Sequence, residues 1–163
     1  MPPAARLTDP VSHPLPPVLT GGPGSPNVTI GFKPAWRGVL AAAAKALQAA
    51  KKTSDAAIET AEKATLAAAG TPGAPAAKAA EEATKAACAA AMGAAITGAA
   101  AGADIHACTT PLPIPPHGPG VVIDGSQTVT INFLPACRQG DSLLEAVGPP
   151  NKIAMGLPTV LIG

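Results

Sequence analysis

The three histidines of the chain and one of its cysteines occur in a pattern typical of metal sites. His106 and Cys108 are two residues apart in the sequence IHAC, so an extended strand would place both side chains on one face. His13 lies far upstream, and His117 follows the sequence TTPLPIPP, which could fold it back toward the pair. Three imidazoles and one thiolate would form a closed tetrahedral shell that suits zinc and leaves no position for a water nucleophile. The same spacing also arises where a histidine and a cysteine simply pack together, so both interpretations stand at this point.

Three copies of a short sequence organise the rest of the chain. PAAR at 3–6, PAWR at 34–37 and PACR at 135–138 are variants of one motif. The residues before the second and third copies, SPNVTIGFK and SQTVTINFL, also match, and LPTVLIG begins a further copy. Repeats this short cannot each bury an apolar face, so we expect them to pack together around a shared axis.

An aspartate follows the arginine of every copy once a long insertion is removed. In the first and third copies it is the third residue after the arginine, Asp9 and Asp141. Arg37 is followed by an alanine-rich segment instead, but deleting residues 38–101 joins it directly to GAD and makes Asp104 the third aspartate. The two ends of the inserted segment must therefore lie close together.

The aspartates relate the candidate ligands to the repeats. Four residues after each aspartate the chain has His13, Cys108 and Glu145. Two of the three equivalent positions thus hold good ligands for a transition metal. Glu145 is a ligand candidate by position alone.

Composition predicts the elements that must position these residues. Residues 1–38 and 104–163 contain short alternating runs such as NVTIGF and TVTINF between Gly and Pro, which indicates short strands and tight turns. Residues 39–103 are dominated by alanine, with a break at GTPGAP, which indicates helices over about 39–69 and 75–102. We expect a mainly β protein, a small pseudo-threefold β-prism or cone of short repeats, interrupted by an α-helical hairpin.

Charge and cysteine usage limit the possible partners and compartment. The net charge is +1, which gives no electrostatic reason to expect nucleic acid or an anionic membrane as the partner. The N-terminal sequence carries Pro and charge where a secretory signal would be apolar, so we expect synthesis in the cytoplasm without a signal peptide. Three cysteines are no disulfide framework. We expect Cys137 to be a packed thiol and Cys88 to belong to an apolar stripe with Met92 and Ile96.

With the insertion removed, the chain resembles the PAAR-repeat family, the spike tips of type VI secretion systems and related contractile injection machines. The resemblance rests on PAARLTDPVSH, GSPNVTIGFKPAWR, ADIHACTTPLPIPPHGPG, SQTVTINFLPACRQGD and VGPPNKIAMGLPTVLIG, and covers nearly all of the chain outside residues 38–103. The motif is intact only at residues 3–6, and its varied position holds Ala5, Trp36 and Cys137.

The resemblance implies a PAAR fold with one structural zinc ion per chain near its apex, held by histidines and a cysteine. The matching residues here are His13, His106, Cys108 and His117. The stretch after Glu145 resembles a family variant in which VGPPNKI replaces a ligand-bearing turn, so Glu145 is left out of the expected set, although its position keeps the question open.

The resemblance also implies a non-enzymatic function. One such tip would cap a trimeric VgrG-like or phage-spike-like protein, sharpen it for puncturing the target envelope, and be expelled on contraction of a type VI or phage-tail-like particle. A cargo effector or a chaperone could bind through the helical hairpin. No catalytic residue and no cofactor other than zinc are expected.

Two other functions compete with this one. The run from 86 to 103 is uncharged and about as long as a membrane span, which would suit a membrane-active effector carried by the tip. Its large side chains are only Met92 and Ile96, however, which favours a close-packed hairpin. A small zinc hydrolase with three histidine ligands and a water would leave Cys108 uninvolved and the repeats unexplained.

Overall fold

The computed structural model describes residues 1–12, 18–108 and 117–163. His13, one of the expected ligands, lies outside the described residues. In chain order the elements are β1 (Pro3–Ala4), β2 (Thr29–Ile30), β3 (Lys33–Pro34), α1 (Ala41–Ala68), α2 (Ala74–Ala99), β4 (His106–Cys108), β5 (Gly118–Val122), β6 (Thr130–Ile131), β7 (Leu134–Pro135), β8 (Ser142–Glu145), β9 (Asn151–Lys152) and β10 (Leu157–Leu161).

The expectation of a mainly β prism or cone is wrong. The two helices contain 28 and 26 residues, whereas the strands in the described part of the chain contain two to five residues each. The strands there form four small antiparallel sheets, linked by isolated bridges. The apolar runs of the repeats pair over only a few residues before the chain turns, whereas the alanine-rich segment is helical along almost its whole length. More of the described residues are therefore in helices than in strands.

The alanine-rich segment forms a helical hairpin of α1 and α2. Both helices begin and end within a few residues of their predicted bounds. Alanine has the highest intrinsic helix propensity, so the segment needs few large side chains to become helical. Gly70, with φ of +78°, follows the end of α1, and Pro75 occupies the first turn of α2, where its missing N–H breaks no hydrogen bond.

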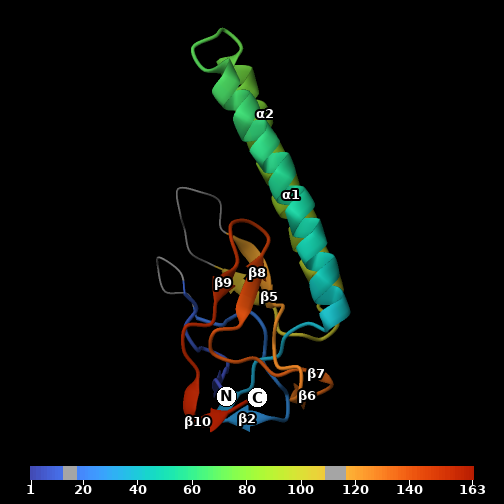
Figure 1. Cartoon of the computed structure of the whole chain (residues 1–163), viewed down its shortest axis with the longest axis vertical. Coiled ribbons are helices and arrows are strands. Elements are labelled where there is room, and N and C mark those ends of the chain that lie inside the picture. Colours follow the sequence, from blue (N-terminus) through green and yellow to red (C-terminus); the bar gives the residue numbers. More distant parts are fainter. Residues whose placement is uncertain (13–17, 109–116) are drawn as a thin grey trace.

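The lower end of the helical hairpin packs on the four-stranded sheet. Leu47 of α1 and Met92 and Ile96 of α2 are at most 3% exposed and lie in one cluster with Val121 of β5 and Leu144 of β8. Full burial of an aliphatic side chain contributes about 1.5–3 kcal/mol relative to exposure. The upper part of the hairpin extends well beyond the sheet (Figure 1). The buried apolar contacts of this cluster thus anchor the lower end of the hairpin.

The apolar part of α2 is accounted for by this packing. Its two large side chains, Met92 and Ile96, are buried at the lower end of the hairpin. Cys88 is half-buried, and its Sγ lies 3.8 Å from the carbonyl oxygen of Ser54 on α1. Among the described residues, no helix combines the length and the apolar character that crossing a membrane requires.

The three motif copies meet through a closed ring of backbone hydrogen bonds. The N–H of Ala5 donates to the carbonyl of Cys137, Cys137 donates to Trp36, and Trp36 donates back to Ala5, with N···O distances of 2.9, 3.0 and 3.0 Å. These residues occupy the varied position of the motif, and each is at most 1% exposed. Their side chains share one core cluster, so the large Trp36 fills space that the two small residues leave. This explains why the position accepts such different sizes.

A second closed ring of backbone hydrogen bonds joins the same copies. In this second ring, the backbone N–H of the residue after each motif arginine donates to the backbone carbonyl of the motif proline in another copy. The bonds are Leu7 to Pro34 (2.9 Å), Gly38 to Pro135 (2.9 Å) and Gln139 to Pro3 (2.8 Å). Backbone groups far apart in the sequence thus satisfy one another outside regular sheets. This repetition of contacts confirms the internal repeats predicted from the sequence.

Each motif arginine holds its aspartate by the same contacts. The arginine backbone N–H and guanidinium donate to the carboxylate, and the aspartate N–H donates back to the arginine carbonyl. The pairs are Arg6 with Asp9, Arg37 with Asp104, and Arg138 with Asp141. Arg37 and Asp104 are 67 positions apart, yet Nη2 lies 2.8 Å from Oδ1. The predicted role of Asp104 as the third aspartate is confirmed, and the ends of the helical insertion lie side by side.

Candidate metal centre

The four-stranded sheet, with the order β4-β5-β8-β9, brings candidate ligands together. His106 on β4 pairs with Gly120 on β5, and Gly120 pairs in turn with Glu145 on β8. A Cβ atom at Gly120 would lie 2.9 Å from Cγ of Glu145, which is too close. Because position 120 has no side chain, the imidazole and the carboxylate can approach each other across the middle strand.

His106, Cys108 and Glu145 form a buried cluster. Along β4 the burial pattern is buried, intermediate, buried, so His106 and Cys108 lie on one face, as their spacing predicts. One potential ligand atom from each of the three side chains lies within 4.8 Å of the others. None of the three residues is more than 6% exposed. Nitrogen, sulfur and oxygen donors thus converge in the interior of a small protein.

The two carboxylate oxygens of Glu145 have different neighbours. Oε1 lies 3.6 Å from Nε2 of His106. Oε2 lies 2.8 Å from Nδ1 of His117 and accepts a 2.7 Å hydrogen bond from Nδ2 of Asn151. A carboxylate with no exposed surface is costly unless hydrogen bonds or positive charge balance it. His117 and Asn151 supply part of that balance at one oxygen.

The expected ligands lie in different places in the structure. It places His106 and Cys108 in the buried cluster, and it places His117 beside Glu145, with 14% of its side chain exposed. Within the described part of the chain, the three-residue cluster contains Glu145 in place of His117. Glu145 was left out of the expected set. The signal that could have included it was its position four residues after Asp141, equivalent to that of Cys108.

The donor set fits zinc. Thiolate, imidazole and carboxylate are the three side-chain ligands that zinc takes in proteins. The thiolate disfavours magnesium and calcium, which prefer oxygen ligands. When bound, the ion would supply positive charge to a site that contains a buried carboxylate and a thiol.

Cys137 is separate from this cluster. It lies in the core with Ala5 and Trp36. Burial raises the pKa of its thiol well above the usual value, and the negative charges of Asp141 and Asp104 raise it further. A thiol that stays protonated at neutral pH is a poor metal ligand. The interpretation of Cys137 as a packed thiol is confirmed.

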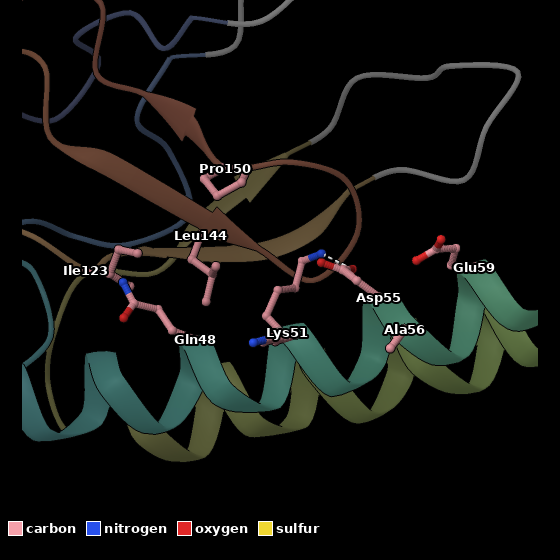
Figure 2. Close-up of a pocket in the computed structure, with 9 residues that line it drawn as sticks. Gln48, Lys51, Asp55, Ala56, Glu59, Ile123, Leu144 and Pro150 are labelled. Atoms are coloured by element: carbon pink, nitrogen blue, oxygen red, sulfur yellow. Dashed lines mark hydrogen bonds and ion pairs between the residues drawn. The ribbon is translucent and has the colours of Figure 1, made fainter.

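A concave region between α1 and the sheet contains no comparable cluster among the described residues. Figure 2 shows Lys51 and Asp55 of α1 on one side and Leu144 and Pro150 on the other. Lys51 is only 6% exposed, and the Asp55 carboxylate forms an ion pair with it. Packing of α1 on the sheet accounts for this region.

Comparisons with protein-family models, with curated proteins and with solved structures found no match. The function of the protein is therefore inferred from its own residues.

Proposed function

We propose that this protein is a non-enzymatic, zinc-stabilised tip that caps the trimeric central spike of a contractile injection machine. The observation that carries the proposal is threefold repetition within one chain: three arginine–aspartate pairs with the same contacts, joined by closed rings of backbone hydrogen bonds. A trimer ends in three equal surfaces around one axis. A single chain can match all three only if it presents three similar surfaces of its own. The resemblance to PAAR-repeat tips favours the same function.

One end of the molecule offers a surface for such a partner. The turns from β2 to β3 and from β6 to β7 carry Phe32 and Phe133, which are 102% and 92% exposed. Their φ angles are +65° and +64°, in the left-handed region that residues with bulky side chains rarely adopt. Fully exposed aromatic side chains are typical anchors of interfaces. β10 and both termini lie at the same end (Figure 1), which we name the docking face.

The metal site would stabilise the part of the chain remote from the docking face. β5, β8 and β9 lie between that face and the far end of the helices (Figure 1). With one Trp, two Phe and no Tyr, the chain builds its core from small side chains, so a structural metal adds folding free energy that packing does not supply. Such a metal would have a structural role, and the tip would need no turnover as the spike enters an envelope.

The helical hairpin would attach cargo. It projects beyond the sheet that carries the candidate ligands (Figure 1), and Leu66 near its turn is 77% exposed. A cargo effector or a chaperone is the partner we propose for it, and not nucleic acid, because the chain has a net charge of only +1. The tip would be made in the cytoplasm, assembled on the particle and expelled on contraction.

The test is assembly with a trimeric VgrG-like spike protein, measured by size-exclusion chromatography with light scattering. We expect a complex of one chain per trimer. The double variant Phe32→Asp/Phe133→Asp should lose the complex, because two interface anchors would carry charge. Its metal content and thermal unfolding should stay close to those of the wild type, since both side chains are exposed.

The matched control is Leu66→Asp, which puts the same charge on an exposed apolar position of the hairpin. It should bind the trimer like the wild type. Three chains per trimer, or equal binding by the double variant and the wild type, would overturn the proposed docking.

A further inference from the structure

We propose that Glu145 is itself a metal ligand and that His117 positions its carboxylate instead of binding the ion. The inference rests on the zinc site of the proposed function and changes its chemistry. The expected set of three histidines and a cysteine becomes a mixed site in which His106, Cys108 and Glu145 supply nitrogen, sulfur and oxygen.

The repeats place Glu145 at a ligand position. It follows Asp141 by the same number of residues as Cys108 follows Asp104. Both aspartates are held by their arginines through the same hydrogen bonds. The backbone that follows each aspartate therefore starts from an equivalent position. The two side chains do converge, because their ligand atoms lie within 4.8 Å of each other.

The distance between Glu145 and His106 suits two ligands of one ion. Oε1 and Nε2 are 3.6 Å apart, longer than the 2.7–3.2 Å typical of a hydrogen bond. Zinc binds nitrogen and oxygen at about 2.0–2.2 Å, so two such ligands of a tetrahedral ion lie roughly 3.3–3.6 Å apart. Gly120 between them makes this spacing possible, as any side chain there would collide with Glu145.

His117 is arranged to hold Glu145. Its Nδ1 lies 2.8 Å from Oε2, the oxygen that also accepts from Asn151. Its Nε2 lies against the turn at Gly148, where an added Cβ would be 3.4 Å away. One oxygen of Glu145 is thus fixed by two side chains while the other is directed at His106. Hydrogen-bonded partners of this kind orient metal ligands and typically change metal affinity by about 10–100-fold.

The test compares Glu145→Gln with His117→Asn in the full-length protein. The asparagine amide can replace Nδ1 of the imidazole as a hydrogen-bond partner of Glu145 but removes Nε2. Zinc affinity is measured by chelator competition, and the ligand field by the visible spectrum of the cobalt(II) form. We expect Glu145→Gln to weaken zinc binding by more than about 100-fold and to change the cobalt spectrum. We expect His117→Asn to weaken zinc binding by about tenfold or less and to retain the cobalt spectrum of the wild type.

Cys108→Ala serves as the control that must lose the thiolate-to-cobalt absorption. A second measurement needs no variant: X-ray absorption of the zinc-loaded wild type should show one sulfur and at most two imidazoles. Three imidazoles, or a spectrum changed by His117→Asn and not by Glu145→Gln, would overturn the assignment of Glu145 while leaving the zinc-stabilised tip intact. A wild type that binds neither zinc nor cobalt would overturn both.

Discussion

The helical hairpin and the repeat part of this chain, residues 1–38 and 104–163, are stabilised by contacts of different range. In the hairpin, all ion pairs but Lys85–Glu62 join residues three or four positions apart, as in Lys51–Asp55 and Glu59–Lys63, and most backbone bonds are those of the helices. In the repeat part, the central ring joins Ala5 to Cys137, across most of the chain. Local contacts form independently of one another, whereas the closed rings require all three copies to be in place.

The charged side chains of the two regions also differ in their exposure to solvent. Glu59 and Lys63 keep 63% and 73% of their side chains exposed, whereas Asp104 and Arg37 keep 1% and 9%. Exposed pairs are screened by water and salt, but a buried charge depends on its partner. The two regions should therefore respond very differently to the loss of one carboxylate.

Asp104→Ala should strongly destabilise the repeat part. Arg37 would keep a buried guanidinium without its carboxylate, and we expect a loss of about 3–5 kcal/mol in the free energy of unfolding. The hydrogen bond to Asp104 is also the main reason why the pKa of Arg37 is raised. Trp36, the one tryptophan of the chain, reports on the repeat part by fluorescence, and helical circular dichroism reports on the hairpin. Urea titrations with both probes measure the change.

Glu59→Ala is the matched control in the hairpin. Because the Glu59–Lys63 pair is exposed, its loss should move the midpoint of thermal unfolding by no more than about one degree. Equal destabilisation by the two changes would contradict the distinction between the regions.

A swap of side chains around the central ring should have an intermediate effect. Trp36→Ala alone leaves a large cavity and should cost about 3–5 kcal/mol. Adding Ala5→Trp returns the same volume to the shared core from an equivalent copy, and the double variant should be about 1–3 kcal/mol less stable than the wild type. Urea unfolding followed by circular dichroism measures the single and the double variants alike, because Trp36→Ala leaves the chain without a tryptophan or tyrosine for fluorescence. If Ala5→Trp adds its own penalty to that of Trp36→Ala, the three side chains do not share one space.

The sequence predicted the features that depend on local pattern or repetition. Alanine content set the helices, and the motif spacing identified Asp104 as the partner of Arg37 across the insertion. The fold class was wrong because the length of strand ladders depends on pairing between distant segments, which alternating runs do not specify. Glu145 was missed for a similar reason. Its position pointed to a ligand, but only the order β4-β5-β8 and the side-chain-free position at Gly120 show that it faces His106.

Glu81, like Lys51, is an exception within the hairpin, because its charged group is buried although its contacts are local. The residue is 5% exposed, and Oε1 accepts from Nζ of Lys78 at 2.9 Å and of Lys85 at 2.7 Å. Lys85 also reaches Glu62 on α1 at 2.7 Å, which joins the two helices. The hydrogen bonds from Lys85 and Lys78 lower the pKa of Glu81 to about 2.

The low pKa of Glu81 predicts a pH dependence of the hairpin's stability. A carboxylate whose pKa is lower in the folded than in the unfolded chain contributes stability above the unfolded value, 4.5, and loses it as pH falls toward about 2. Helical circular dichroism should show the midpoint of thermal unfolding falling across that window. Other carboxylates titrate there as well, so the informative quantity is the difference between the wild type and Glu81→Gln. That difference should be constant above about pH 5 and shrink below it, because the glutamine variant has already lost the charge that acid removes. A difference independent of pH would show that Glu81 contributes by packing and not by its charge.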